Sequence, residues 1–136
     1  MRSVVDTSVA ARWCLPDEKR DEDAAQVLDQ ALRDGIHVPA LWPFELFNVL
    51  LRALRLGRID EAGFDRAIVL LSNLNVEVEN APDWDTGQVI FAIAQSQNLT
   101  FYDASYLELA RRLDLPLATG DEKLQKAAKR MGLRRG

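Results

Sequence analysis

The chain has 136 residues, of which 48% are hydrophobic and 28% charged, and its formal net charge is −4. This composition suits one packed domain over residues 1–136 and excludes a polycation that grips nucleic acid over its whole surface. One cysteine, Cys14, and one histidine, His37, exclude an internal disulfide and a Cys/His zinc site. Neither a signal peptide nor an apolar run near the ~20 residues that span a bilayer is present, which predicts a cytoplasmic protein with no membrane partner.

Short apolar strands and amphipathic helices alternate along the first half of the chain. Val4 and Val5 predict a strand that ends at Asp6, and a helix follows over about residues 8–13. A stripe of apolar residues from 24 to 32 predicts a second helix, with Gly35 as its stop. The next elements are a strand in residues 36–41, a strongly apolar helix from 42 that ends at Gly57, and a helix over 60–74.

The second half continues the alternation. Residues 76–79 predict a strand, and residues 83–98 and 103–114 predict helices. The run 115–120 predicts the last strand, and a final helix begins at Asp121 and stops at Gly132. This order predicts an α/β/α sandwich around a short, mostly parallel sheet, in which sites form beyond the carboxyl ends of the strands.

Three aspartates fall where that edge is expected. Asp6 follows the first strand, Asp103 follows the run LTFY and opens a helix, and Asp121 follows the last strand. In a parallel sheet all three would lie along the carboxyl edge. Each one by itself is more simply explained as a helix cap alone, because aspartate is a favoured N-cap residue.

A fourth acid, Glu45, lies on the strongly apolar helix. Glu45, Asn48, Arg52 and Arg55 are spaced i, i+3, i+7 and i+10 and form one narrow polar stripe. An ordinary solvated face is the simplest interpretation. A helix this apolar is also expected to be buried on several sides, some of it against a second subunit, and the stripe would then line a polar cleft.

Four carboxylates that converge without matching cations repel one another, which raises their pKa values. Shared protons or a hard divalent cation relieve this repulsion, and Mg²⁺ and Mn²⁺ prefer carboxylate and water ligands. A metal held in this way activates water for attack on a phosphodiester. An all-carboxylate site therefore indicates phosphoryl chemistry on nucleic acid, with Asp6, Glu45, Asp103 and Asp121 as candidates for catalysis and metal binding.

Four segments in order resemble the PIN-domain ribonucleases, in particular the VapC-type toxins of bacterial toxin–antitoxin pairs. These segments are VVDTSV at 4–9, PFELFNVL at 43–50, FYDASYLELA at 101–110 and LATGDEKL at 117–124. The resemblance implies a PIN-like fold and an endoribonuclease dependent on Mg²⁺ or Mn²⁺. Asp6 and Asp103 would be its central ligands, and Glu45 and Asp121 would complete the site, partly through waters.

The resemblance also implies supporting residues and partners. Thr7 or Ser8 and Thr119 would hydrogen-bond the carboxylates or the attacking water, and Asn48 of the polar stripe is a further supporting candidate. The expected partners are an RNA substrate, a second copy of the chain, and a cognate VapB-type antitoxin, in a dimer or a larger toxin–antitoxin assembly. The antitoxin would lay a C-terminal segment along an apolar groove and place a basic side chain near the acids. Relatives often end with a short extra strand, whereas this chain ends at MGLRRG.

Basic residues supply candidate RNA contacts, namely Arg52, Lys123, Lys126 and Arg130, although a solvated helix surface is the simpler interpretation. Two other functions stay open. One is a catalytically silent PIN-like module that only binds a protein partner, and the other is a phosphoacceptor or phosphatase that uses Asp6 as nucleophile. Cys14 and His37 are expected to be structural.

Overall fold

The structure is a computed structural model that describes residues 1–18 and 22–136. Its strands are β1 (Ser3–Val5), β2 (Ile36–Val38), β3 (Val76–Val78) and β4 (Leu117–Ala118). Its helices are α1 (Thr7–Cys14), α2 (Glu22–Asp34), α3 (Trp42–Arg55), α4 (Glu61–Ser72), α5 (Trp84–Gln97), α6 (Phe101–Leu113) and α7 (Glu122–Arg130). The predicted alternation of strands and helices is therefore confirmed.

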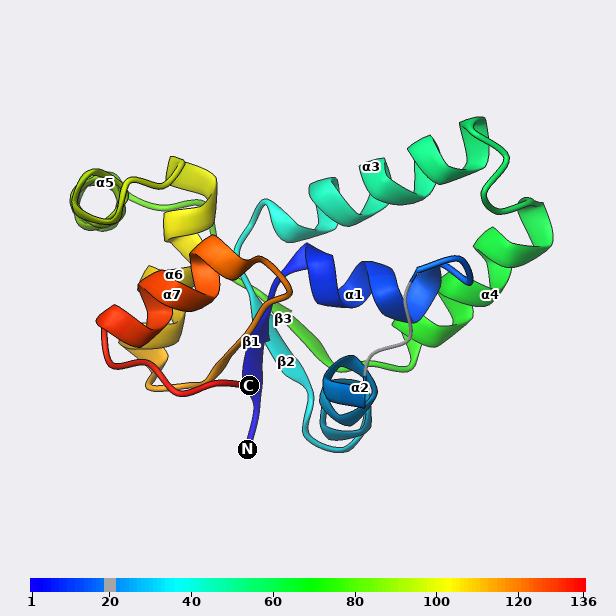
Figure 1. Ribbon diagram of the computed structural model, residues 1–136, viewed down its shortest axis with the longest axis horizontal. Helices are drawn as coiled ribbons and strands as arrows, with labels where there is room; N and C mark the ends of the chain where they lie inside the picture. The colour runs from blue at the N-terminus through cyan, green and yellow to red at the C-terminus, as the bar shows by residue number, and fades with distance from the viewer. Residues whose placement is uncertain (19–21) are drawn as a thin grey trace.

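The four strands form one parallel sheet in the order β3-β2-β1-β4. Helices α1 to α4 lie on one side of this sheet and α5 to α7 on the other (Figure 1), which confirms the predicted α/β/α sandwich. Because the strands are parallel, their carboxyl ends meet at one edge. Asp6 lies there beside the end of β4, since its N–H donates to the Ala118 carbonyl at 3.0 Å.

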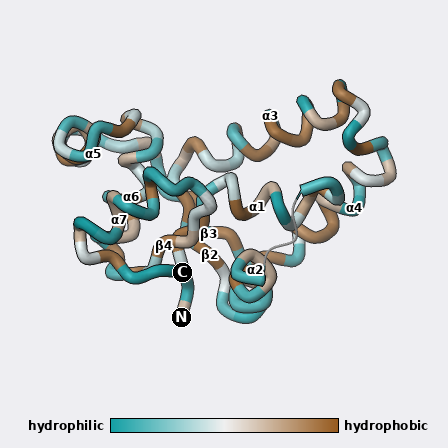
Figure 2. Tube along the Cα trace, viewed as in Figure 1, coloured by the Kyte–Doolittle hydropathy of each residue, from teal (hydrophilic) through white to brown (hydrophobic). Residues whose placement is uncertain are grey.

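The strands are short, and β1, β2 and β4 form the largely buried centre of the sheet, which is brown in Figure 2, whereas β3 at the edge is partly exposed. Val4, Val5, Ile36 and Val38 have no exposed surface. Burying an aliphatic side chain of this size stabilises a fold by roughly 1.5–3 kcal/mol. Glycines end three of the helices as predicted, since Gly35, Gly57 and Gly132 all adopt a positive φ just after a helix.

Helix α3 differs from the prediction that it is buried on several sides. It buries one face through Trp42, Leu46 and Leu50, whereas Phe44 is 81% exposed and Phe47 54% exposed. The prediction is wrong within this chain because α3 reaches beyond the edge of the sheet (Figure 1), and its main packing neighbours among the described residues are α1 and α4. An apolar surface is therefore left on the outer side of α3.

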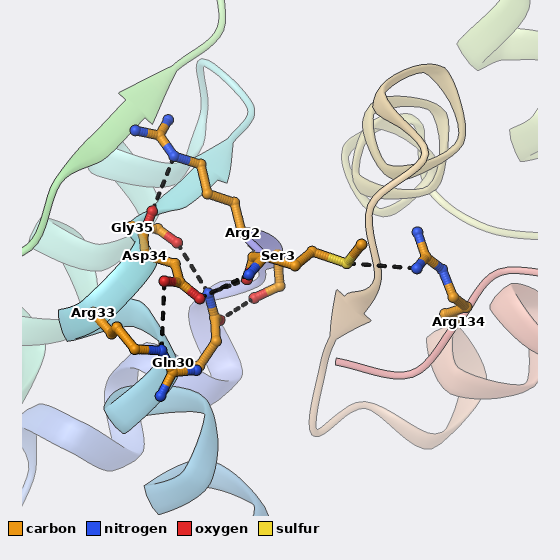
Figure 3. A network of polar contacts seen from close by, with 8 residues as sticks. Arg2, Ser3, Gln30, Arg33, Asp34, Gly35 and Arg134 are labelled. Carbon is orange, nitrogen blue, oxygen red and sulfur yellow. Dashed lines mark hydrogen bonds and ion pairs between the residues drawn. The ribbon is translucent and has the colours of Figure 1, made fainter.

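The amino edge of the sheet is held by charged and polar contacts (Figure 3). The amino group of Met1 donates to Asp34 Oδ2 at 2.8 Å, and Arg2 Nε donates to the Asp34 carbonyl at 3.0 Å. Gln30 accepts from Ser3 Oγ at 2.8 Å and donates to the Met1 carbonyl at 2.6 Å. The Met1 ammonium lowers the pKa of Asp34, so this carboxylate is well neutralised.

The end of the chain returns to the sheet beside β4. The Leu117 N–H donates to the Arg134 carbonyl at 3.0 Å, and the Gly136 N–H donates to the Leu117 carbonyl at 2.9 Å. Arg135 forms a single parallel bridge with Leu117. The segment after Gly132 thus extends the sheet by one bridge in place of a full strand.

Of the two residues expected to be structural, Cys14 is buried and His37 is partly buried. Cys14 lies beside Leu50 and Ala53 in the apolar cluster where α1, α3 and α4 meet, and burial raises the pKa of its thiol to about 11. His37 lies on β2, where its Nε2 is 3.3 Å from Arg2 Nη1. Among the described residues, no helix combines the length and the apolar character needed to cross a bilayer.

Candidate active site

Asp6 begins the site because β1 ends at Val5 and the next residue caps α1. Its Oδ1 accepts from the Ser8 N–H at 3.0 Å, the Val9 N–H at 3.4 Å and the Ser8 hydroxyl, while its Oδ2 accepts from the Thr119 hydroxyl. The prediction that Asp6 caps the following helix, α1, is therefore confirmed. A carboxylate has about four lone-pair positions, so Oδ2 keeps one that faces no donor of the described residues.

The environment of Asp6 disfavours its charge. The residue is only 6% exposed, and burial raises its pKa in spite of the bonds from Ser8, Thr119 and Val9, which act in the opposite direction. A carboxylate that is buried and also ordered by four donors is held in one orientation. A cation next to Oδ2 would remove the penalty that burial imposes.

Glu45 lies in the first turn of α3 and is held by two hydroxyl groups. Its Oε1 accepts from Tyr106 OH at 2.7 Å and from Thr7 Oγ1 at 3.1 Å. The two hydroxyl oxygens are 3.3 Å apart. This supports the prediction that Thr7 hydrogen-bonds a carboxylate of the site, and it leaves Oε2 of Glu45 available.

Tyr106 was missed by sequence reasoning. Burial raises its pKa, and the charges of Glu45 and Asp6 raise it further, so the phenol stays protonated and donates. The influence of Asp6 also means that Asp6, Tyr106 and Glu45 lie within electrostatic reach of one another. Its position three residues after Asp103 on one helix is the signal that could have found it, because such residues share a face.

Asp103 does not open its helix, which corrects the prediction. Helix α6 begins earlier, at Phe101, because Thr100 is its N-cap and the Thr100 hydroxyl accepts from the Asp103 N–H at 3.1 Å. Asp103 therefore lies inside the first turn. Burial raises its pKa and the charge of Asp121 raises it further, while Lys123 acts in the opposite direction.

The loop after β4 joins these acids. Asp121 caps α7 by accepting from the Leu124 N–H at 3.0 Å, and its own N–H donates to Thr119 Oγ1 at 3.0 Å. The Gly120 N–H donates to Ser8 Oγ at 2.8 Å. Thr119 thus contacts both Asp6 and Asp121, and Ser8 contacts both Asp6 and the loop, as their predicted supporting roles require.

The four acids share the carboxyl edge, but they do not form a closed ligand set. In residues 1–18 and 22–136, no three acidic, cysteine or histidine side chains lie close enough together to hold a metal ion. Their role as metal ligands therefore stays a prediction. The donors nevertheless suit Mg²⁺, which commonly binds one or two carboxylates and keeps several waters.

The remaining candidates are more exposed. Asn48 and Arg52 lie on the solvent side of α3, with Asn48 one turn beyond Glu45. Lys126 pairs with Glu122 at 3.2 Å, and Arg130 Nε donates to Gln97 Oε1 at 2.8 Å. The charge of Lys123 lowers the pKa of a site acid, Asp103. RNA binding by all four basic residues stays a prediction.

Comparison with known proteins gives the family. Residues 3–130 match the PIN domain. The chain is 33% identical over 105 residues to ribonuclease VapC1 of Mycobacterium tuberculosis, covering 76% of this chain and 77% of that protein. It is 32% identical over 127 residues to ribonuclease VapC3 of Pyrobaculum aerophilum, covering 91% and 92%. The crystal structure of PAE2754 from Pyrobaculum aerophilum matches with a TM-score of 0.68 at 26% identity, covering 93% of this chain and 86% of that one. The chain therefore belongs to the PIN-domain family and is similar to its VapC ribonucleases.

Proposed function

We propose that the protein is a metal-dependent endoribonuclease and the toxin of a toxin–antitoxin pair. The observation that carries this proposal is the carboxyl edge of the sheet, where Thr119 joins the buried Asp6 to Asp121, and the charge of Asp121 raises the pKa of Asp103. Relatives named ribonuclease VapC1 and ribonuclease VapC3 support RNA as the substrate.

The donor set suits Mg²⁺ or Mn²⁺ because it consists of carboxylate oxygens. Asp6 and Asp103 would be the central ligands, and Glu45 and Asp121 would complete the site through waters. When bound, such an ion supplies charge for the phosphate oxygens and lowers the pKa of a bound water. It would also offset the burial of Asp6 and the repulsion between Asp103 and Asp121.

The side chains of the protein would orient the reacting groups. Ser8 and Thr119 hold the Asp6 carboxylate in one rotamer. Tyr106 and Thr7 donate to Oε1 of Glu45, and its other oxygen, Oε2, would accept a proton from an attacking water. The positive charge of Lys123 beside Asp103 would attract the RNA phosphate.

A protein partner is supported by the exposed apolar side of α3. Phe44 directly precedes Glu45, and Phe44 and Phe47 are both more than half exposed. Apolar side chains gathered beside a polar site are typical of an interaction surface. We assign this surface to an antitoxin segment or a second copy of the chain, in a homodimer or a larger assembly.

Incubation with a circular single-stranded RNA tests the activity most cleanly. An endoribonuclease opens the circle in Mg²⁺ or Mn²⁺ and is inactive in EDTA, whereas an enzyme that needs an RNA end leaves the circle intact. Asp6→Asn and Asp103→Asn proteins should leave it intact under all conditions. Cleavage that persists in EDTA or in these variants would contradict the metal-dependent mechanism.

The alternative functions give different results in the same experiment. A silent interaction module cleaves no RNA with any metal, although it still binds a protein partner. A phosphoacceptor would become labelled at Asp6 by a small phosphodonor. The structure gives that function little support, because Asp6 is only 6% exposed and accepts four hydrogen bonds.

A further inference from the structure

A cavity of about 560 Å³ lies beside β4, between α1, α2, α7 and the end of the chain. We call it the β4 cavity. Pockets that hold small organic ligands have volumes of about 300–1,000 Å³, so a nucleotide unit fits a space of this size. Apolar side chains, among them Val9, Val27 and Leu133, form part of its wall and offer a base a surface to pack on.

The β4 cavity is positively charged on an acidic protein. Among the described residues, its lining holds five cationic side chains and two carboxylates. The cations are Arg12, Lys126, Lys129, Arg134 and Arg135, and the carboxylates are Asp23 and Glu122. Asp23 pairs with Arg135 at 2.8 Å, Glu122 with Lys126 at 3.2 Å, and Arg134 with Asp114, a residue outside the lining, at 3.5 Å. The described side chains that line the cavity therefore carry more positive than negative charge, on a chain of net charge −4.

The cavity is continuous with the candidate active site through one loop. Thr119 and Gly120 belong to its lining. The same two residues hold the site together, because Thr119 donates to Asp6 and the Gly120 N–H donates to Ser8. A ligand in the β4 cavity is therefore separated from the carboxylates only by the thickness of this loop.

Gly120 brings Arg12 against that loop. A Cβ atom at position 120 would lie 2.6 Å from Arg12 Nη2 and 2.9 Å from Arg12 Cζ. The absence of a side chain at Gly120 thus lets the guanidinium group of Arg12 pack on the loop, at the wall of the cavity. An arginine at this point can contact a phosphate that lies next to the cut bond.

The opposite flank of the site has the opposite charge. A second cavity, of about 510 Å³, is lined by Glu79, Asp83 and Glu108 and by one cationic side chain among the described residues, Arg112. An RNA strand carries a negative charge at each phosphate, so it is repelled from this cavity and attracted to the other.

We propose that the β4 cavity binds the phosphates of single-stranded RNA on one side of the cut bond, with Arg12 and Lys129 as binding residues. This rests on the proposed ribonuclease function. The two residues approach the cavity from different helices, α1 and α7, and neither is part of the carboxylate site. They bind substrate equally well before and during the reaction, so they affect KM and leave kcat unchanged.

Steady-state cleavage of a single-stranded RNA in Mn²⁺, measured across a series of KCl concentrations, tests the proposal. Each phosphate contact contributes about 0.7 to the salt slope of single-strand binding. Arg12→Gln with Lys129→Gln should make that slope shallower by about 1.4 and raise KM by roughly 25-fold at ~0.1 M salt, with kcat unchanged. The matched control is Arg66→Gln with Arg111→Gln, which removes two exposed cations of α4 and α6 outside the cavity and should keep the wild-type KM.

The outcomes separate this proposal from the function on which it rests. An unchanged KM and salt slope in the Arg12/Lys129 variant, with wild-type cleavage intact, overturns the β4 cavity as an RNA site and leaves the ribonuclease standing. A wild-type protein that cleaves no RNA overturns both. If a polyglutamate peptide binds the wild type but not the variant, while KM for RNA is equal in both, the cavity holds an acidic protein segment and the RNA assignment is wrong.

Discussion

Carboxylates at the two edges of the sheet have pKa values shifted in opposite directions. At the amino edge, Asp34 receives the Met1 ammonium at 2.8 Å and its pKa is lowered (Figure 3). At the carboxyl edge, burial raises the pKa of Asp6, and burial together with Asp121 raises that of Asp103. One edge therefore neutralises its acids with its own cations, and the other keeps a charge imbalance that an external cation would relieve.

This difference separates structural from functional acids. A paired carboxylate stabilises the fold in its charged form, whereas an acid with a raised pKa costs stability when it ionises. Perturbed acids of the second kind gather at functional sites, although structural networks also perturb pKa values. The polar groups around Asp6 and Glu45 orient the carboxylates without cancelling their charge, because they are hydroxyl and backbone N–H donors.

Removing one acid from each edge should give the largest contrast in activity. Asp103→Asn at the carboxyl edge should lower RNA cleavage by more than ~100-fold, since even groups that only orient a metal ligand contribute about 10–100-fold. Asp34→Asn at the amino edge should keep wild-type cleavage and lower only the melting temperature. Initial rates on one RNA, with circular dichroism to verify folding, measure both effects. Comparable activity losses in the two variants would remove the distinction between the edges.

Tyr106→Phe sharpens the comparison by removing a donor and no charge. Glu45 Oε1 would lose its 2.7 Å bond from the phenol and keep only the bond from Thr7. Cleavage should fall by about tenfold, in the range seen for groups that orient a metal ligand. Stability should fall by about 1 kcal/mol, the usual net value of one hydrogen bond. Denaturant unfolding and kcat/KM give the two numbers. Unchanged kcat/KM would mean that Glu45 needs no second hydroxyl to act.

The smallest expected effect concerns the pH dependence of the free energy of unfolding in EDTA. The contributions of Asp34 at the amino edge and Asp6 at the carboxyl edge should change with pH in opposite directions. The pKa of Asp34 is lowered in the fold, so its contribution is complete above the unfolded value of about 3.9 and is lost as pH falls through the folded value. The pKa of Asp6 is raised, so stability falls as pH rises from the unfolded value through the folded one.

Replacing each of these two acids by asparagine reveals whether its charge stabilises or destabilises the fold. At neutral pH, Asp34→Asn should melt below the wild type and Asp6→Asn above it, since asparagine retains the capping of α1. Both differences should vanish in acid, where the carboxyl groups are protonated. Melting curves over a pH series measure them, and shifts of the same sign in both variants would contradict the opposed edges.

The sequence predicted the site acids that follow strands, for a local reason. Asp6 comes directly after a buried apolar run and Asp121 follows one after two intervening residues, and aspartate at such a junction also caps the next helix. Asp103 was harder, because the aromatic pair Phe101 and Tyr102 obscures where α6 begins. The start is decided by the hydroxyl of Thr100, which caps the helix before the aromatic pair.

What could not be predicted depends on contacts between distant segments. Glu45 meets Thr7 across 38 residues of sequence and Tyr106 across 61, and no local pattern encodes such distances. The same holds for Arg12, whose place against Gly120 requires α1 to lie beside the loop after β4. The exposure of the apolar outer face of α3 could not be predicted either, because hydrophobic periodicity identifies an apolar face but not the element that packs on it.

The thermal shift produced by Mn²⁺ tests the functional carboxyl edge most directly. Saturation to about 100 times Kd should stabilise the wild type by about 2.7 kcal/mol, or about 5–10 °C in melting temperature for a chain of this size. Asp34→Asn should respond like the wild type, whereas Asp6→Asn and Asp103→Asn should respond much less. An equal shift in all four proteins, or none in the wild type, would contradict a metal site built from these acids.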